Sequence, residues 1–266
     1  MTILEVAGLG IDFGGLTAVE AVSFSVRRGA IMSVIGPNGA GKTTLFNMVS
    51  GIYRPTRGRV VLDGRDVTGL APHKLAAMGM SRTFQNLKVF QQMSVLQNVM
   101  AGRHLSEGVH VVSDLLGLPG AARRNRESEE EAHRLLRLVG LERGAFREAS
   151  ELSYGGLKRL EIARALATQP RLLLLDEPAA GCNVVETGEI DELISRIAET
   201  GVAVLLVEHD MKLVMKISAH VVVMEQVRKI SEGPPQEVAN DPRVIEAYLG
   251  SGAETGAKGG GERAQG

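Results

Sequence analysis

A glycine-rich run beside a lysine and two threonines is the feature of this sequence best suited to chemistry. Residues 36–44 read GPNGAGKTT, after the apolar run Ile31–Ile35 and at the start of a helical pattern over Lys42–Val49. Residues without a Cβ let backbone N–H groups curl around phosphate oxygens, and the following helix adds free N–H groups and the positive end of its dipole. Lys42 can then reach the β- and γ-phosphates, and the Thr43 hydroxyl is placed to bind Mg²⁺. The run therefore predicts a nucleoside triphosphate site that comprises Gly36, Pro37, Asn38, Gly39, Ala40, Gly41, Lys42, Thr43 and Thr44.

A second candidate is an acidic pair that follows four leucines, in RLLLLDEP at residues 171–178. Leu172–Leu175 predicts a buried strand, and Asp176 stands at its carboxyl end, where open α/β sheets present groups to ligands. Asp176 would hold Mg²⁺ through water, and Glu177 would orient and deprotonate an attacking water. Alone, such a pair is more often a strand terminus at the surface. Beside a phosphate loop it indicates triphosphate hydrolysis.

A sheet with covering helices must position these residues. Helical patterns occupy 42–49 and 186–198, and the alternation of helices with strands predicts an α/β fold. The first strands follow one another without a helix, which predicts an antiparallel β edge. Charged helical sequence such as Arg123–Leu138 dominates residues 87–168, so we expect a helical subdomain inserted there. Short β-branched runs predict the strands at 21–26, 31–35, 59–62, 172–175, 203–207 and 220–224.

The composition argues against several classes of function. The 30 Lys and Arg balance 31 Asp and Glu, so the chain lacks the basic excess that nucleic acid binding requires. With Phe 6, Tyr 3 and Trp 0, stacking of bases on aromatic side chains is not expected. No apolar run approaches the roughly 18 residues of a membrane span, and the single Cys182 cannot form an internal disulfide, which favours a soluble intracellular protein. Residues 251–266 are rich in glycine and are expected to be disordered.

Further motifs follow the phosphate loop in a fixed order. They are SRTFQNLKVF with Gln85, LSYGGLKRLEIARAL at 152–166, RLLLLDEP, AAGCN, and LLVEHD with His209. In this order they resemble the motifs of the ATP-binding subunits of ABC transporters, over about residues 3–250. Gln85 is similar to the family's Q-loop glutamine, 152–166 to its signature, AAGCN to its D-loop and His209 to its switch histidine. Phe13 stands where the family places an aromatic that stacks on adenine, although with so few aromatics a core role stays open.

The resemblance implies a P-loop NTPase core of ABC type over residues 1–250, with the helical subdomain inserted at about 87–168. It also implies a head-to-tail dimer with two ATP molecules between the protomers, since neither half alone surrounds the γ-phosphate with donors. Ser153 and the Gly155 backbone of one chain would contact the γ-phosphate held by the other. The segment 86–93 would meet a coupling helix of a membrane permease. The implied catalytic residues are Glu177, His209, Gln85 and Lys42, and the implied Mg²⁺ ligands are Thr43, Gln85 and Asp176.

A finer resemblance points to the importers of branched-chain amino acids. It implies an ATP-hydrolysing energy-coupling subunit on the cytoplasmic face of the cell membrane, held there by permease subunits and paired with an identical or related ATPase subunit. A solute-binding protein would act indirectly. Import of urea or amides, lipopolysaccharide export, and a soluble ABC ATPase without a transport role remain as alternatives. The motifs that carry the resemblance are FGGLTAV at 13–19, RTFQ at 82–85, Tyr154, RLEIARAL at 159–166, DEPAAG at 176–181, VEHDMKLVM at 207–215 and VIEAYLG at 244–250.

Four positions depart from the usual pattern of this subgroup. Gly156 replaces a signature Gln, Cys182 a Leu, Val184 a Pro and Val227 a hairpin Gly. Gly156 removes an amide near the nucleotide and costs roughly 1 kcal/mol of helix propensity in a first helical turn. Val227 would strain a turn that needs positive φ. We therefore expect ATPase activity that is weakened but present.

Overall fold

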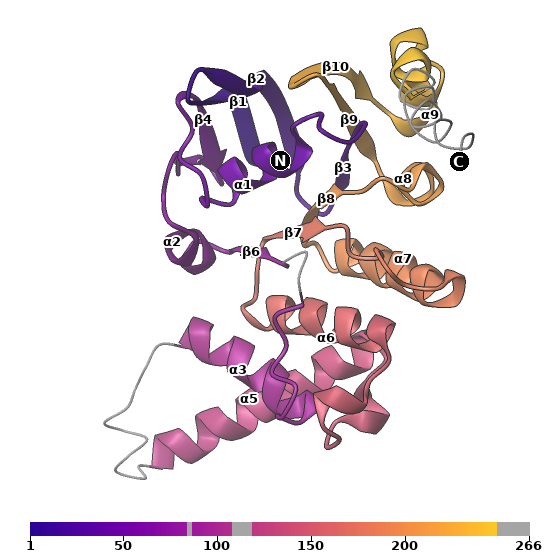
Figure 1. The fold of residues 1–266 in the computed structure, drawn as a ribbon. Coiled ribbons are helices and arrows are strands. Elements are labelled where there is room, and N and C mark those ends of the chain that lie inside the picture. Colours follow the sequence, from indigo (N-terminus) through magenta and orange to yellow (C-terminus); the bar gives the residue numbers. More distant parts are fainter. Residues whose placement is uncertain (84–86, 108–118, 249–266) are drawn as a thin grey trace, which may run out of the picture.

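The computed structural model describes residues 1–83, 87–107 and 119–248 (Figure 1). The strands are β1 (Thr2–Phe13), β2 (Leu16–Arg27), β3 (Ile31–Ile35), β4 (Arg57–Leu62), β5 (Arg65–Asp66), β6 (Met80–Arg82), β7 (Leu172–Asp176), β8 (Ala203–Val207), β9 (His220–Glu225) and β10 (Arg228–Gly233). The helices are α1 (Lys42–Val49), α2 (Pro72–Ala77), α3 (Val95–Glu107), α5 (Pro119–Leu138), α6 (Tyr154–Ala167), α7 (Val184–Glu199), α8 (Met211–Ile217) and α9 (Pro235–Ala239). Two 3-10 turns, η1 (Glu142–Gly144) and η2 (Ala149–Glu151), precede α6.

A six-stranded sheet with the order β10-β9-β3-β8-β7-β6 forms the centre of the molecule. All neighbouring strands in it are parallel except β9 and β10. Strands β3, β7 and β8 are buried along their whole length, which explains why they read as continuous apolar runs rather than alternating ones. The predicted α/β fold is confirmed. Because these strands are parallel, their carboxyl ends meet at one edge, where Asp176 of β7 pairs in register with Val207 of β8.

The antiparallel strands form a sheet of their own, with the order β2-β1-β4-β5. Strands β1 and β2 are joined by Gly14 and Gly15, whose φ values are 53° and 89°. Two adjacent residues with positive φ match the twist of a tight hairpin, which brings the two long strands together. The predicted antiparallel edge thus has two parts: this separate sheet, and β10 at the border of the parallel sheet.

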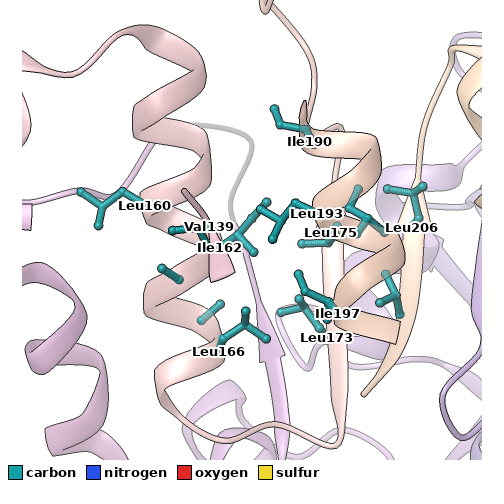
Figure 2. Packing of buried hydrophobic residues seen from close by; sticks show 14 of the residues in the cluster. Val139, Leu160, Ile162, Leu166, Leu173, Leu175, Ile190, Leu193, Ile197 and Leu206 are labelled. Carbon is teal, nitrogen blue, oxygen red and sulfur yellow. The ribbon is translucent and has the colours of Figure 1, made fainter. Parts of the chain in front are cut away.

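Two apolar clusters cover the two faces of the parallel sheet. Alternate leucines of β7 contribute to each: Leu173 and Leu175 pack against the helices, while Leu172 and Leu174 face α1 and the antiparallel sheet. Figure 2 shows part of the first cluster, in which Ile162 and Leu166 of α6 point toward side chains of β7 and α7. Helix α6 is therefore fixed to the same core that fixes β7, the strand that carries the acidic pair.

The described chain between β6 and β7 contains α3, α5 and α6 and lies at one end of the molecule (Figure 1). Helix α3 packs against α5 and α6, and α6 also contacts α7. The buried residues of α3, α5 and α6 belong to the same apolar cluster as residues of the parallel sheet, so these helices and the sheet share one continuous core. In the described parts of the chain, no helix combines the length and the apolar character needed to cross a membrane.

The β9–β10 hairpin contains a strained residue. Its turn residues Gln226 and Val227 have φ of 43° and 67°, a left-handed conformation that β-branched residues rarely adopt. The expected strain at Val227 is confirmed. We expect Val227→Gly to raise the free energy of unfolding by about 1 kcal/mol, as measured by urea denaturation, because glycine adopts this φ without a steric penalty. Val227→Ala keeps a Cβ, so it should raise the free energy of unfolding by less than Val227→Gly. An equal increase in both variants would contradict the explanation.

Candidate functional site

The phosphate loop runs from the carboxyl end of β3 to the start of α1, and the backbone around it leaves no room for side chains at two glycines. Gly36 has φ of 149°, and a Cβ there would lie 2.0 Å from the Met224 carbonyl oxygen. Gly41 has φ of 93°, and its Cβ would lie 2.7 Å from the carbonyl oxygen of Ala18. Strands β9 and β2 thus press against the loop from two sides and fix its shape.

Lys42 lies inside the phosphate loop and bonds its backbone. Its ammonium donates hydrogen bonds to the carbonyl oxygens of Gly36 and Pro37, at 2.6 and 2.9 Å. The residue is only 8% exposed, and burial lowers its pKa, while the negative charges of Glu177 and Asp176 act in the opposite direction. The Lys42 ammonium is therefore held within the loop, close to the carboxylates of Asp176 and Glu177. Thr43 is exposed and Thr44 half-buried in the first turn of α1.

Asp176 lies buried at the end of β7 and pairs with Arg82, for which the sequence predicted no role. The Arg82 guanidinium donates to Asp176 Oδ2 at 2.9 Å and also to the side chains of Asn47 and Ser50. Burial raises the pKa of Asp176, and the positive charge of Arg82 opposes that rise. The positive charge of Arg82 therefore stabilises the Asp176 carboxylate in its buried position. Arg82 precedes Gln85 by three residues in the chain. Gln85 itself lies outside the described residues.

Glu177 faces a different partner from its neighbour Asp176. Its φ is 46°, an uncommon conformation outside glycine, and its N–H donates to the Val207 carbonyl at 2.9 Å. One oxygen of its carboxylate lies 3.7 Å from His209 Nδ1. The His209 side chain is 61% exposed, so the pair opens toward solvent. The structure brings together Lys42, Asp176, Glu177 and His209, which come from three separate segments of the chain.

Glu208 is a buried acid beside His209 for which the sequence predicted no role. It is 1% exposed, and its carboxylate accepts hydrogen bonds from the N–H groups of His209 at 3.0 Å and Ala179 at 3.5 Å. Burial raises its pKa, and these hydrogen bonds oppose the rise. Glu208 thereby connects Ala179, which follows the acidic pair, with His209. Its place directly before His209 in LLVEHD was the one sequence feature that could have identified it.

Ser153 and Gly155 lie at the beginning of α6. The Ser153 hydroxyl caps the helix by accepting from the Gly156 N–H at 3.2 Å. The hydrogen bonds described for Ser153 and Gly155 stay within α6 or reach α7, and none reaches the phosphate loop of the same chain. The start of this helix is therefore separate from the four residues assembled around the loop.

Gly156 is buried in the first turn of α6, and its φ lies outside the left-handed region. A Cβ would stand 3.2 Å from Leu152 Cβ, which requires only a small shift. We expect Gly156→Gln to raise the ATP hydrolysis rate of the complex with the permease subunits two- to fivefold, because it restores a side-chain amide near the nucleotide, and one hydrogen bond that lowers the barrier by about 0.5–1 kcal/mol gives this change. Gly156→Ala serves as the control for the amide group. An unchanged rate in Gly156→Gln would show that this departure has no catalytic cost.

Phe13 lies at the end of β1 and is 46% exposed, outside the apolar core. Its ring meets that of Tyr53 edge to face, with centroids 5.5 Å apart. Tyr53 was not identified from the sequence. The start of β2, which follows Phe13 after the two-glycine turn, contacts the phosphate loop through Ala18. Tyr53 lies in the turn after α1, the helix that begins at the loop, so both aromatic residues stand on segments connected to the loop.

The C-terminal end of the described chain also reaches the loop. Burial raises the pKa of Tyr248 to about 12, against the effect of a hydrogen bond with the Gly36 backbone. Tyr248 belongs to the VIEAYLG motif. That motif therefore contributes to the support behind the first glycine of the loop.

The residues present fit a Mg²⁺-bound triphosphate. The loop presents backbone N–H groups, a buried lysine and a helix start to an anion. Asp176 and Thr43 offer hard oxygen donors, and Mg²⁺ in proteins is commonly bound by one or two such groups together with substrate phosphates. The overlap that a Cβ at Gly36 would create shows that the loop depends on glycine to keep this shape.

Comparisons with known proteins point in the same direction. A family profile described as ABC transporter matches residues 19–180, and one described as branched-chain amino acid ATP-binding cassette transporter matches residues 228–254. The chain is 47% identical to the high-affinity branched-chain amino acid transport ATP-binding protein BraF of Pseudomonas aeruginosa, over 93% of this chain and 98% of that protein. It is 45% identical to LivG of Escherichia coli, a protein with the same description, with the same coverage. The solved ADP conformation of MJ1267, an ATP-binding cassette of an ABC transporter, is 33% identical with a TM-score of 0.82 and covers 94% of this chain and 99% of that one.

Proposed function

The chain belongs to the ABC transporter family, and we propose that it is the ATP-hydrolysing, energy-coupling subunit of an importer for branched-chain amino acids. The observation that carries the substrate assignment is similarity over nearly the full length to BraF and LivG, combined with the match of residues 228–254 to a branched-chain amino acid cassette profile. Tyr248, next to the phosphate loop, lies in that C-terminal region, so the resemblance extends to the site itself.

We infer the following division of roles around ATP. Lys42 and the backbone of Gly36–Thr44 bind the phosphates, and Phe13 contacts the adenine ring. Glu177 accepts a proton from the attacking water, and His209, 3.7 Å from its carboxylate, holds that water and the γ-phosphate in place. Bound Mg²⁺ would neutralise charge on the phosphate oxygens, with Thr43, Asp176 and Gln85 as its protein ligands.

We infer that a second ATPase subunit completes the site. Ser153 and Gly155 make no described hydrogen bond to the phosphate loop of their own chain, which supports their acting on ATP held by a partner. Two chains placed head to tail would each supply a phosphate loop to one ATP and a signature helix to the other. ATP then binds the two chains together, and its hydrolysis releases them.

An apolar groove of about 320 Å³ offers a contact for the permease. It lies between α2, β6, α3 and α6, and its walls include Leu75, Met80, Gly102 and Ala165. Lys88, within the segment 86–93, is one of its lining residues. We propose that a short helix of the permease docks here, so that the ATPase is held at the cytoplasmic face of the membrane. Movement of Arg82, which lines the groove and bonds Asp176, would connect docking to the site.

Copurification tests this proposal. The tagged chain should retain two permease subunits and an ATPase partner, and a leucine-loaded solute-binding protein should accelerate ATP hydrolysis by the purified complex. Identification of the ATPase partner decides between a homodimer and a heterodimer. Retention of permeases whose complex responds to urea or an amide, and not to leucine, would show that the substrate assignment is wrong.

A further inference from the structure

The signature helix α6 has an anion on its first turn, supplied by the same chain. The Ser153 hydroxyl donates to Glu186 Oε1 at 2.8 Å, and the Gly155 N–H donates to the same oxygen at 3.1 Å. Ser153 and Gly155 are the two groups assigned above to the γ-phosphate of a partner's ATP. A carboxylate therefore occupies the donors that a phosphate would need.

Glu186 reaches this position from the first turn of α7. Its other oxygen accepts from the Asn183 N–H at 3.3 Å, and the Asn183 side chain accepts from the N–H groups of Val185 and Glu186, which together form a capping box. The side chain lies close against Gly155, where a Cβ would come within 2.6 Å of Glu186 Cδ. Hydrogen bonds from Ser153, Asn183 and Gly155 lower the pKa of Glu186, so the group is a carboxylate at neutral pH.

The donors do not need Glu186 to hold them in place. Ser153 is oriented as the N-cap of α6, and Gly155 N–H is one of the free donors that every helix start presents. Removing the negative charge of Glu186 would leave both groups available to a phosphate. It would also remove a like charge that repels the γ-phosphate at close range.

From these contacts, and resting on the proposed function, we propose that Glu186 is a positioning residue: its carboxylate occupies Ser153 and Gly155 until the γ-phosphate of the partner's ATP displaces it. Closure of the ATP-bound dimer then includes an exchange of one anion for another on the signature helix. The exchange raises the ATP concentration needed for closure and leaves the chemical step untouched.

The test compares Glu186→Gln with wild type in the assembled transporter. Glutamine is also accepted at this position of a capping box, so the variant keeps the α7 cap while losing the charge. We expect the half-saturating ATP concentration to fall about three- to tenfold, with kcat within twofold, since a hydrogen bond to a charged group is replaced by a weaker neutral one. Glu189→Gln is the matched control, because Glu189 lies one turn further along α7 and pairs with Arg159.

Three results would overturn the inference. An unchanged or higher half-saturating ATP concentration in Glu186→Gln would show that the carboxylate does not compete with ATP. A melting temperature clearly lower than that of Glu189→Gln, with a parallel loss of kcat, would show a structural role only. Both results leave the proposed function intact when the wild-type complex hydrolyses ATP. Absence of hydrolysis by the wild-type complex would overturn the proposed function and this inference together.

Discussion

Glu177→Gln is expected to reduce ATP hydrolysis by the assembled complex at least about 100-fold while ATP binding changes less than about threefold. A positioned general base contributes roughly 10²–10⁴ to a rate, and glutamine keeps the shape of the side chain without its basicity. Glu177 is suited to this role because it lies beside His209 at the open side of the site, whereas Asp176 is buried against Arg82. Steady-state hydrolysis and equilibrium binding of labelled ATP give the two quantities.

The same variant should accumulate an ATP-bound dimer, because closure no longer ends in hydrolysis. Size-exclusion chromatography of the full-length chain with Mg²⁺ and ATP, together with its ATPase partner where one is identified, would detect it. Turnover equal to wild type would show that Glu177 is not the base. Loss of both turnover and ATP binding would instead indicate that the strained backbone at Glu177, with φ of 46°, had been disturbed.

Lys42→Ala is expected to weaken ATP binding and to lower kcat/KM at least about 100-fold. Removing one preorganised group that stabilises developing charge typically costs about 10²–10³ in rate, and here the group is a buried cation at the mouth of the loop. The substitution also leaves the carbonyl groups of Gly36 and Pro37 without their described donor. Isothermal titration with ATP and a hydrolysis assay provide the measurement.

Lys216→Ala is the control for Lys42→Ala, because Lys216 is a largely exposed lysine of α8 that makes one long ion pair with Asp191. Its loss should leave ATP binding and hydrolysis close to wild type. If Lys42→Ala bound ATP as tightly as Lys216→Ala, the loop would not be the phosphate site.

The parts of the fold that the sequence predicts are those with a local signal. Strands β3, β7 and β8 are short, apolar and buried on both faces, so their limits could be read almost residue by residue. Strand β1 was not predicted, because its pairing contains several register shifts and its sequence is interrupted by Gly8 and Gly10. Strand β10 was not predicted either, because it is a polar strand at the border of the sheet that only its pairing with β9 defines.

The start of α7 shows how a local signal can be overlooked. The sequence predicts a helix from residue 186, but α7 begins at Val184. Asn183 followed three residues later by Glu186 is the pattern of a capping box, and it marks the observed start. The predicted helix therefore starts at Glu186, the second residue of the capping box, two residues after the observed start.

The candidate site divides in the same way. The phosphate loop is contiguous in sequence, and its glycines and lysine could be identified directly. The partners of Asp176 and of the signature could not, because they depend on folding: Arg82 meets Asp176 across 94 positions, and Glu186 meets Ser153 across 33. Neither contact leaves a periodic or spacing signal, so only the structure identifies them.

We propose that this chain hydrolyses ATP to drive the import of branched-chain amino acids. The most direct measurement is uptake of labelled leucine by proteoliposomes that contain the complete transporter, with the solute-binding protein outside and Mg²⁺ and ATP on the side of the ATPase subunits. We expect uptake that requires ATP and ceases when this chain carries Glu177→Gln. Equal uptake with the variant, or ATP hydrolysis that proceeds without any leucine uptake, would contradict it.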